Sequence, residues 1–293
     1  MKVELKADLC LILVTMFWGI SCLLTKIGLG GIQEFNLIAL RFVIAFLVSA
    51  FVFNKKLRNI DLITLKYSAI TGTLLFTILT FMTFGVKYTS VSNAGFLTCL
   101  EGIFVPILLF VFLKQKQEPK VWVAVCLAFM GVYLLTIHGI QGTISFNIGD
   151  FFCVLCSLGF AVFILVTDRL TKKVDSLSLG ILQLGFVGIY SLIFSFALES
   201  PILPATTQSW LVVLALSLLC SAFGFITMPI AQQHTSPTHT GIIFCLEPAF
   251  AAFFAFIFLK EILSPRGYLG AFLLIASILL VEVDIHKLKT KKC

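Results

Sequence analysis

Residues 88–114 read YTSVSNAGFLTCLEGIFVPILLFVFLK, and residues 234–260 read HTSPTHTGIIFCLEPAFAAFFAFIFLK. The two segments align without a gap at an offset of 146 residues, and 11 of the 27 positions are identical. The identical positions include the glutamates Glu101 and Glu247, each near the middle of an apolar run long enough to cross a bilayer. The chain is therefore an internal duplication that repeats a buried acid.

The composition is that of a membrane protein. With 59% hydrophobic residues, 12% charged residues and a mean hydropathy of +1.08, the chain has too little polar surface to coat a soluble globule. A bilayer core of roughly 30 Å requires roughly 20 helical residues, and the apolar runs lack the alternation of barrel strands. We therefore predict an all-α polytopic membrane protein with ten spans, near 8–30, 34–53, 65–86, 91–113, 120–137, 149–168, 176–198, 209–231, 238–259 and 266–284.

The ten spans divide into two sets of five, in residues 1–138 and 149–286. A repeat with an odd number of spans enters the membrane in opposite directions in its two copies, so the halves are predicted to be inverted repeats within one integral membrane unit. The first spans of the halves align less well, although Asp8 matches Asp150 at an offset of 142. Inverted repeats suit a carrier that exposes one central site to either side in turn.

Basic residues predict the orientation. If both termini are cytoplasmic, the inner segments hold sixteen of the 21 lysines and arginines, the outer segments hold three, and Lys26 and Arg41 lie within spans. The positive-inside rule then places both termini in the cytoplasm, together with the loops at 54–64, 114–120 and 169–175. The expected location is the cell membrane. These loops account for the net charge of +7, so no nucleic-acid partner is predicted.

Two motifs resemble a known family. Residues 245–263, CLEPAFAAFFAFIFLKEIL, resemble the signature of the EamA-type drug/metabolite transporter superfamily, and Phe17, Trp18, Gly19 and Lys26 are similar to its first helix. The resemblance covers nearly the whole chain. It implies a ten-helix transporter of small metabolites in which each half is one EamA unit and a cavity lies between them. The family commonly has glycine before the final glutamate of the motif, whereas here a lysine precedes it and the first copy reads LKQK.

Four charged residues lie inside predicted spans: Glu101, Glu247, Lys26 and Arg41. An ionised side chain at the bilayer centre costs roughly 2.5–3.5 kcal/mol, so each must face a partner or water. One interpretation places all four around a cavity as substrate or proton sites, although the position of Arg41 nearer the packed loops favours a structural or gating role for it.

The alternative interpretation is structural. Acids and bases could pair as clamps between helices, or protonated glutamates could bond to backbone groups freed around Pro106 and Pro248, which we group with Arg41 as structural or gating residues. The sequence leaves both interpretations open.

Further residues complete the predicted substrate site: Phe17, Trp18, Thr77, Thr80, Asn93, Ser157 and His239. Thr77 and Thr80 belong to a helical stripe that begins at Thr73, and Ser157 lies on a stripe of small residues. Both stripes also suit close helix packing in lipid. Asn93 and His239 are equivalent in the repeat, and suit either a cavity mouth or an interfacial position.

Motifs for other functions are absent. The sequence has no G-x-x-x-x-G-K-[ST] for ATP, and no H-E-x-x-H or G-x-S-x-G for hydrolysis, so a membrane enzyme is disfavoured. Four dispersed histidines do not suggest a metal site, and no cofactor is expected. A channel would need symmetric rings of charge or carbonyls. Secondary transport is the favoured function.

The charges also suggest a substrate. Lys26 and Arg41 against Glu101 and Glu247 sum to zero with separated signs, which favours an amino-acid-like zwitterion whose carboxylate faces Lys26. Purely cationic drugs are the alternative if Lys26 is paired with an acid. Because burial favours the neutral form of a carboxyl group, either glutamate could exchange protons in antiport with the substrate. Substrate, lipid and protons are thus the expected partners, and both a monomer and a homodimer remain open.

Overall fold

The computed structural model describes residues 2–58, 60–89, 91–136, 148–259 and 265–282. All regular secondary structure in these residues is helical. The elements are α1 (Lys2–Gly28), α2 (Glu34–Val52), α3 (Asn54–Leu57), α4 (Leu62–Tyr88), α5 (Val91–Thr98), α6 (Glu101–Leu113), α7 (Pro119–Thr136), α8 (Ile148–Leu170), α9 (Ser176–Leu198), α10 (Thr207–Ala215), the π-helix η1 (Leu216–Phe223), α11 (Gly224–Gln232), α12 (Pro237–Phe244), α13 (Glu247–Leu259) and α14 (Pro265–Glu282).

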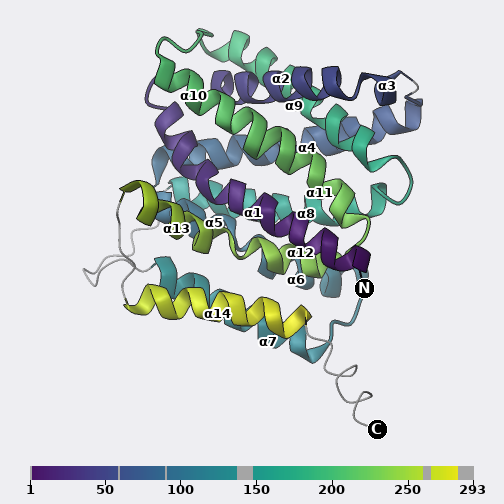
Figure 1. Cartoon of the computed structure of the whole chain (residues 1–293), viewed down its shortest axis with the longest axis vertical. Coiled ribbons are helices and arrows are strands. Elements are labelled where there is room, and N and C mark those ends of the chain that lie inside the picture. Colours follow the sequence, from purple (N-terminus) through teal and green to yellow (C-terminus); the bar gives the residue numbers. More distant parts are fainter. Residues whose placement is uncertain (1, 59, 90, 137–147, 260–264, 283–293) are drawn as a thin grey trace.

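The helices stack along the long axis of the molecule (Figure 1). Helices α2 and α9 lie near one end of this stack, α7 and α14 form the other end, and α1 and α8 lie between them. Six helical segments of the described residues are long and apolar enough to cross a bilayer: Val3–Gly28, Glu34–Val52, Leu62–Tyr88, Ile148–Leu170, Ser176–Leu198 and Thr207–Gln232. The expected all-α polytopic membrane fold is confirmed, whereas the count of ten spans stays a prediction.

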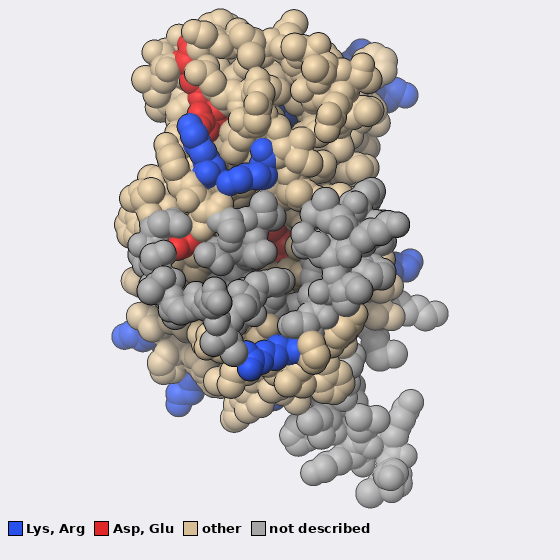
Figure 2. Space-filling model, turned by 90° about the vertical axis from the view of Figure 1, so that its left-hand side faces the viewer, with Lys and Arg blue, Asp and Glu red and all other residues tan. Residues whose placement is uncertain are grey.

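The surface agrees with a lipid environment. Large apolar side chains such as Phe51, Phe112, Phe196 and Phe272 are exposed on the outside of the bundle. On the face shown in Figure 2, most of the described surface is uncharged, and the charged side chains form small groups. Such extensive apolar exposure is costly in water and favourable in lipid.

The equivalent runs 91–113 and 238–259 are each broken into two helices, which the sequence analysis did not foresee. The first run forms α5 and α6 with a turn at Cys99 and Leu100, and the second forms α12 and α13 with a turn at Cys245 and Leu246. Each glutamate of the repeated motif is thus the first residue of a new helix. Discontinuous helices in corresponding positions of two repeats typically mark the binding site of a transporter.

Hydrogen bonding explains how the chain passes these breaks. At the second break, the amide of Leu246 donates to the carbonyl of Ile243 at 3.0 Å, a spacing of three residues that tightens the turn. Pro248 then occupies the second position of α13, where its missing N–H leaves no helical bond unmade. The first break has the equivalent turn, because the amide of Leu100 donates to the carbonyl of Leu97 at 3.4 Å.

The two broken helices cross each other at a close contact. A Cβ atom placed on Gly102 would lie 2.2 Å from the Sγ of Cys245 and 2.4 Å from the carbonyl oxygen of Gly241. The thiol of Cys245 also faces the carbonyl of Cys99 at 3.7 Å. Only glycine fits at position 102, so the Cys-Leu-Glu motifs of the two halves are held against each other.

Several contacts between the halves join helices that are equivalent in the repeat. Helix α2 packs on α9, α7 packs on α14, and α6 packs on α12. Contacts between non-equivalent helices also occur in corresponding pairs. The third span of the first half, α4, packs on the first helix of the second half, α8, and the first helix of the first half, α1, packs on α11 in the third span of the second half. An inverted two-fold relation between residues 1–138 and 149–286 would produce this pairing, although the domain boundaries themselves stay a prediction.

Candidate functional site

A small cavity of about 30 Å³ lies where the two halves meet. Helices α1, α2, α4, α5 and α6 line it from the first half, and α8, α11 and α13 line it from the second. The lining residues are Trp18, Ser21, Arg41, Ile78, Leu79, Met82, Thr98, Glu101, Cys156, Phe160, Phe225 and Glu247. Both halves therefore contribute to one site.

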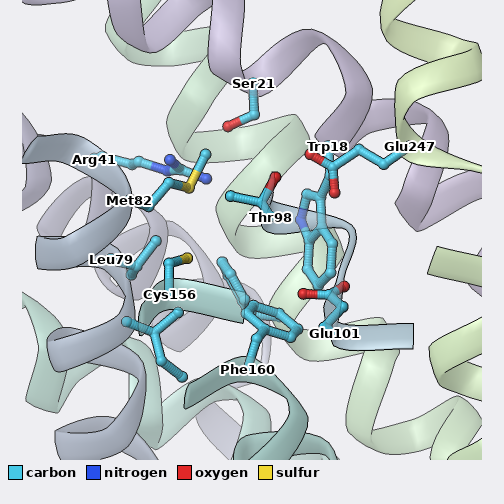
Figure 3. A pocket seen from close by; sticks show the side chains of 12 residues that line it. Trp18, Ser21, Arg41, Leu79, Met82, Thr98, Glu101, Cys156, Phe160 and Glu247 are labelled. Atoms are coloured by element: carbon cyan, nitrogen blue, oxygen red, sulfur yellow. The ribbon is translucent and has the colours of Figure 1, made fainter. Parts of the chain in front are cut away.

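Charges of opposite sign occupy different parts of this cavity. Figure 3 shows Arg41 on one side and Glu101 and Glu247 on the other, with Thr98 between them in this view. All three charged side chains are at least 92% buried, because their exposures are 5%, 4% and 8%. Within the described residues, neither carboxylate hydrogen-bonds to a side chain and neither forms an ion pair with Arg41. The charged groups thus face the cavity without neutralising one another directly.

Within the described residues, Arg41 is held by one hydrogen bond and keeps other donors available. Its Nε donates to the hydroxyl of Ser221, and its guanidinium lies 5.3 Å from the ring centre of Phe42. A guanidinium carries five N–H donors, so the terminal nitrogens retain donors that can bind an anion. The hydroxyl of Ser21, which lines the same cavity, has no hydrogen-bond partner among the described residues.

The π-helix η1 provides the partners of both Arg41 and Trp18. Ser221 belongs to η1, and the carbonyl of Cys220 in the same segment accepts a hydrogen bond from the indole Nε1 of Trp18 at 2.9 Å. Gly224 follows directly, and a Cβ atom there would lie 2.4 Å from Trp18 Nε1. Irregular π-helical turns often occur at functional sites. Through the two hydrogen bonds to η1, Trp18 of α1 and Arg41 of α2 contact the span formed by α10, η1 and α11.

Aromatic rings fix the apolar wall of the cavity. The ring of Trp18 lies 5.4 Å from Phe160, 4.9 Å from Phe225 and 5.0 Å from Phe244, measured between ring centres. These contacts tie α1 to α8, α11 and α12.

The backbone of α11 beside this wall is bonded by a side chain. Pro229 has no N–H to donate to the carbonyl of Phe225, and the side-chain amide of Gln183 donates to that oxygen at 2.7 Å instead.

The structure brings four of the residues singled out in the sequence to the cavity: Glu101, Glu247, Trp18 and Arg41. Arg41, which the sequence analysis placed in a structural or gating role, faces the cavity. Pro106 is buried in α6 and Pro248 in α13, so both proline positions lie next to the glutamate turns rather than among the lining residues.

Lys26 lies away from the cavity. Its Nζ donates to the carbonyls of Val86 at 2.6 Å, Lys87 at 3.2 Å and Thr89 at 3.0 Å. These carbonyls end α4, where the helix leaves backbone acceptors unpaired and a cation is favourable. Lys26 therefore binds the C-terminus of α4.

The threonine stripe of α4 also faces away from the cavity. Thr77 is exposed and Thr80 is half-buried, and their hydroxyls donate to the carbonyls of Thr73 and Phe76 in their own helix. The cavity is instead lined by Ile78, Leu79 and Met82.

Ser157, Phe17 and His239 also lie outside the cavity lining. The hydroxyl of Ser157 is bonded to the carbonyl of Val154 at 2.9 Å, and Phe17 packs edge-on against Phe223. His239 is half-buried near the start of α12. The side chain of Asn93 lies outside the described residues.

Sequence reasoning missed Ser21, Thr98 and Cys156. Each is a small residue in an apolar run, and such residues look alike whether they pack helices or line a cavity. The one available signal was position, because Ser21 follows Trp18 by three residues and shares its helix face.

Comparison with known proteins agrees with this architecture. The model of the EamA-like transporter family matches residues 5–137 and 147–283, which is most of the chain. The chain belongs to the EamA-like transporter family. Through this family it is also a member of the drug/metabolite transporter superfamily, and it is a multi-pass membrane protein.

Similar proteins carry transporter names. A protein of Archaeoglobus fulgidus described as an uncharacterized transporter is 30% identical over 289 residues, which cover 96% of this EamA-like chain and 87% of the relative. The uncharacterized transporter YetK of Bacillus subtilis is 25% identical, with 90% and 83% of the two chains covered. A solved crystal structure shares the fold with a TM-score of 0.79 at 17% identity, covering 95% of this chain and 98% of that one. The family and these names indicate a transporter rather than an enzyme.

Proposed function

We propose that the protein is a secondary transporter that moves a small metabolite across the cell membrane by alternating access. The observation that carries this proposal is the cavity of Arg41, Glu101 and Glu247, because residues of both halves supply its charged groups. A single site between repeats suits a carrier, since movement of one half against the other can expose it to either side.

The substrate class follows from the division of charge. Arg41 can bind a carboxylate with two parallel N–H···O bonds, a geometry that guanidinium groups favour. Glu101 and Glu247 can accept bonds from an ammonium group on the opposite side. An amino-acid-like zwitterion fits this arrangement, with Arg41 taking the role that the sequence analysis gave to Lys26.

The apolar part of the substrate would contact the hydrophobic wall. Ile78, Leu79 and Met82 of α4 and the rings of Phe160 and Phe225 line the same cavity as the charged groups. Contact with this wall removes apolar surface of the substrate from water, which contributes about 25 cal/mol per Å². We therefore favour an amino acid with an apolar side chain over a small or polar one.

Two glutamates in one cavity suggest how transport is coupled. A carboxylate in a water-poor site is costly unless a cation or a proton neutralises it, and one ammonium group cannot neutralise two carboxylates. Substrate and proton would therefore replace each other at Glu101 and Glu247 as the site faces first one side and then the other. Proton antiport follows from this exchange.

A purely cationic substrate is the second candidate. Two acids face one arginine, so the cavity is acidic whenever both glutamates are ionised. In that case Arg41 would only support the helix packing through Ser221.

Competition in a reconstituted flux assay separates the two candidates. Purified protein in liposomes is first screened with radiolabelled amino acids, and the best substrate is then challenged with its amide, its decarboxylated amine and its deaminated acid. For leucine these analogues are leucinamide, isoamylamine and isocaproate. We expect each analogue to compete much less well than the parent. An amine that competes as well as the parent would exclude the carboxylate contact and leave the cation candidate.

A further inference from the structure

Two threonine–aspartate contacts join the halves of the molecule. The hydroxyl of Thr89, after α4, donates to Oδ1 of Asp150 at the start of α8, at 2.6 Å. The hydroxyl of Thr235, after α11, donates to Oδ1 of Asp8 near the start of α1, at 3.0 Å. Both aspartates are buried, each with an exposure of 5%. In each contact the threonine and the aspartate come from different halves.

The two contacts are equivalent in the repeat. Thr89 matches Thr235 at the offset of 146, and Asp8 matches Asp150 at the offset of 142 that relates the first spans. The same bond is therefore made twice with the roles of the halves exchanged.

The contacts lie at opposite ends of α1, on either side of the cavity. Lys26 binds the carbonyl of Thr89, and it is eighteen residues from Asp8 along α1, a distance of about 27 Å in a helix. This separation is close to the thickness of the bilayer core, roughly 30 Å. Trp18, which lines the cavity, lies between the two ends.

Each threonine has a second contact close by, formed within the half to which the threonine belongs. At one end Lys26 binds the last carbonyls of α4, as described above. At the other end the side-chain amide of Gln233, after α11, donates to the carbonyl of Thr171, after α8, at 3.2 Å. Each end thus brings together the end of one span and the starts or ends of two others.

We propose that Thr89–Asp150 and Thr235–Asp8 are the two gates of the cavity, which close its opposite ends and break alternately during transport. This inference rests on the proposed function, because it assigns the moving contacts of the same site. Hydrogen bonds suit this task, since water can replace either partner when an end opens, and the net cost is modest. Both contacts are formed in this structure.

The first test needs no substrate, because the cavity holds a native reporter. Cys156 lines the cavity and its thiol is free. A charged, membrane-impermeant thiol reagent is applied to right-side-out and inside-out vesicles, and the labelling of Cys156 is measured by peptide mass spectrometry. The variants are Thr89→Val and Thr235→Val, which keep the side-chain shape and remove the donor.

We expect each variant to raise the labelling rate several-fold from one side only, and the two variants to act from opposite sides. The matched control is Thr71→Val, because Thr71 is buried in α4 and, among the described residues, its hydroxyl bonds only to carbonyls of that helix. Equal changes from both sides, or labelling like that of the control, would overturn the proposal.

The second test uses cross-linking of the reconstituted protein. Double variants with Thr89→Cys and Asp150→Cys, or with Thr235→Cys and Asp8→Cys, are treated with a short thiol cross-linker that a reductant cleaves. We expect either cross-link to abolish flux and the reductant to restore it. If the contacts are merely structural, flux continues with the cross-link in place, and the gates are excluded.

The two tests separate failure of the gates from failure of the proposed function. If flux of a zwitterion persists with either cross-link in place, the transport function stands and the proposal that these contacts are gates is excluded. Absence of zwitterion flux in the unmodified protein would instead remove the substrate class, while one-sided labelling of Cys156 would still support the gates.

Discussion

Glu101 and Glu247 hold equivalent positions in the two halves, since each is the first residue after a break in a helix and both face one cavity. The breaks themselves touch, because Gly102 allows α6 to approach Cys245. The duplicated motif thus places two carboxyl groups at the junction of the halves, where a carrier needs its site.

The first prediction concerns coupling. In liposomes, the Glu101→Gln and Glu247→Gln variants should lose the response of flux to an imposed pH gradient, because an amide keeps the shape of the side chain but cannot bind and release a proton. Glu118→Gln is the control, since Glu118 lies outside the cavity and pairs with Lys120. Unchanged gradient dependence in both cavity variants would make the glutamates structural groups.

The second prediction compares the two basic residues. Hydrogen bonds to charged groups contribute about 1.5–3 kcal/mol, so Arg41→Gln should reduce the preference for leucine over isoamylamine about tenfold or more. Lys26→Gln should leave this preference unchanged, because Lys26 binds the end of α4. Competition curves for the two variants measure this directly. Loss of the preference in Lys26→Gln alone would place the carboxylate at Lys26, as the sequence suggested.

The third prediction concerns stability. Gly102→Ala should lower the free energy of unfolding by about 1–3 kcal/mol, because the new Cβ would overlap Cys245 and the backbone of Gly241. Gly95→Ala is the matched control, since nothing lies within 4 Å of a Cβ at that position of the preceding helix. Thermal unfolding in detergent compares them. Equal melting temperatures for the two variants would show that the broken helices separate easily.

The sequence predicted the membrane fold because hydrophobic run length and the absence of alternation are direct consequences of lipid. It also singled out Glu101, Glu247 and Trp18, which line the cavity, because a duplicated acid in an apolar run and an aromatic residue beside a glycine can be recognised from the sequence. These signals depend only on residue type and on the repeat, and both can be read from one sequence.

The sequence could not predict the helix breaks or the partners of the basic residues. A turn at Cys99 and Leu100 costs only a few backbone hydrogen bonds. Neither of these two residues is a helix breaker, so the sequence does not mark the position of the turn. Lys26 and Arg41 each stand alone in an apolar span, and only the packing of α4 and η1 decides which of them faces the cavity. The spacing of residues along the chain does not show which helices pack against these two side chains.

The fourth prediction is topological. Cysteines introduced at Lys56 and Lys172 should resist a membrane-impermeant reagent applied to intact cells and should react after the membrane is opened, because the basic loops are expected in the cytoplasm. Both lysine side chains are exposed, at 58% and 60%, so accessibility of the residues does not limit the reaction. Labelling of either position in intact cells would show that the predicted orientation is wrong.

Counterflow tests the central claim, that this cavity carries a zwitterion, most directly. Proteoliposomes loaded with unlabelled amino acids are diluted into a trace of the same amino acids in radiolabelled form. The account predicts transient, saturable accumulation of label above its equilibrium level, and predicts that this accumulation is lost when Arg41→Gln is combined with Glu101→Gln and Glu247→Gln. Uptake no greater than in protein-free liposomes, or a flux that rises linearly without saturation, would contradict it.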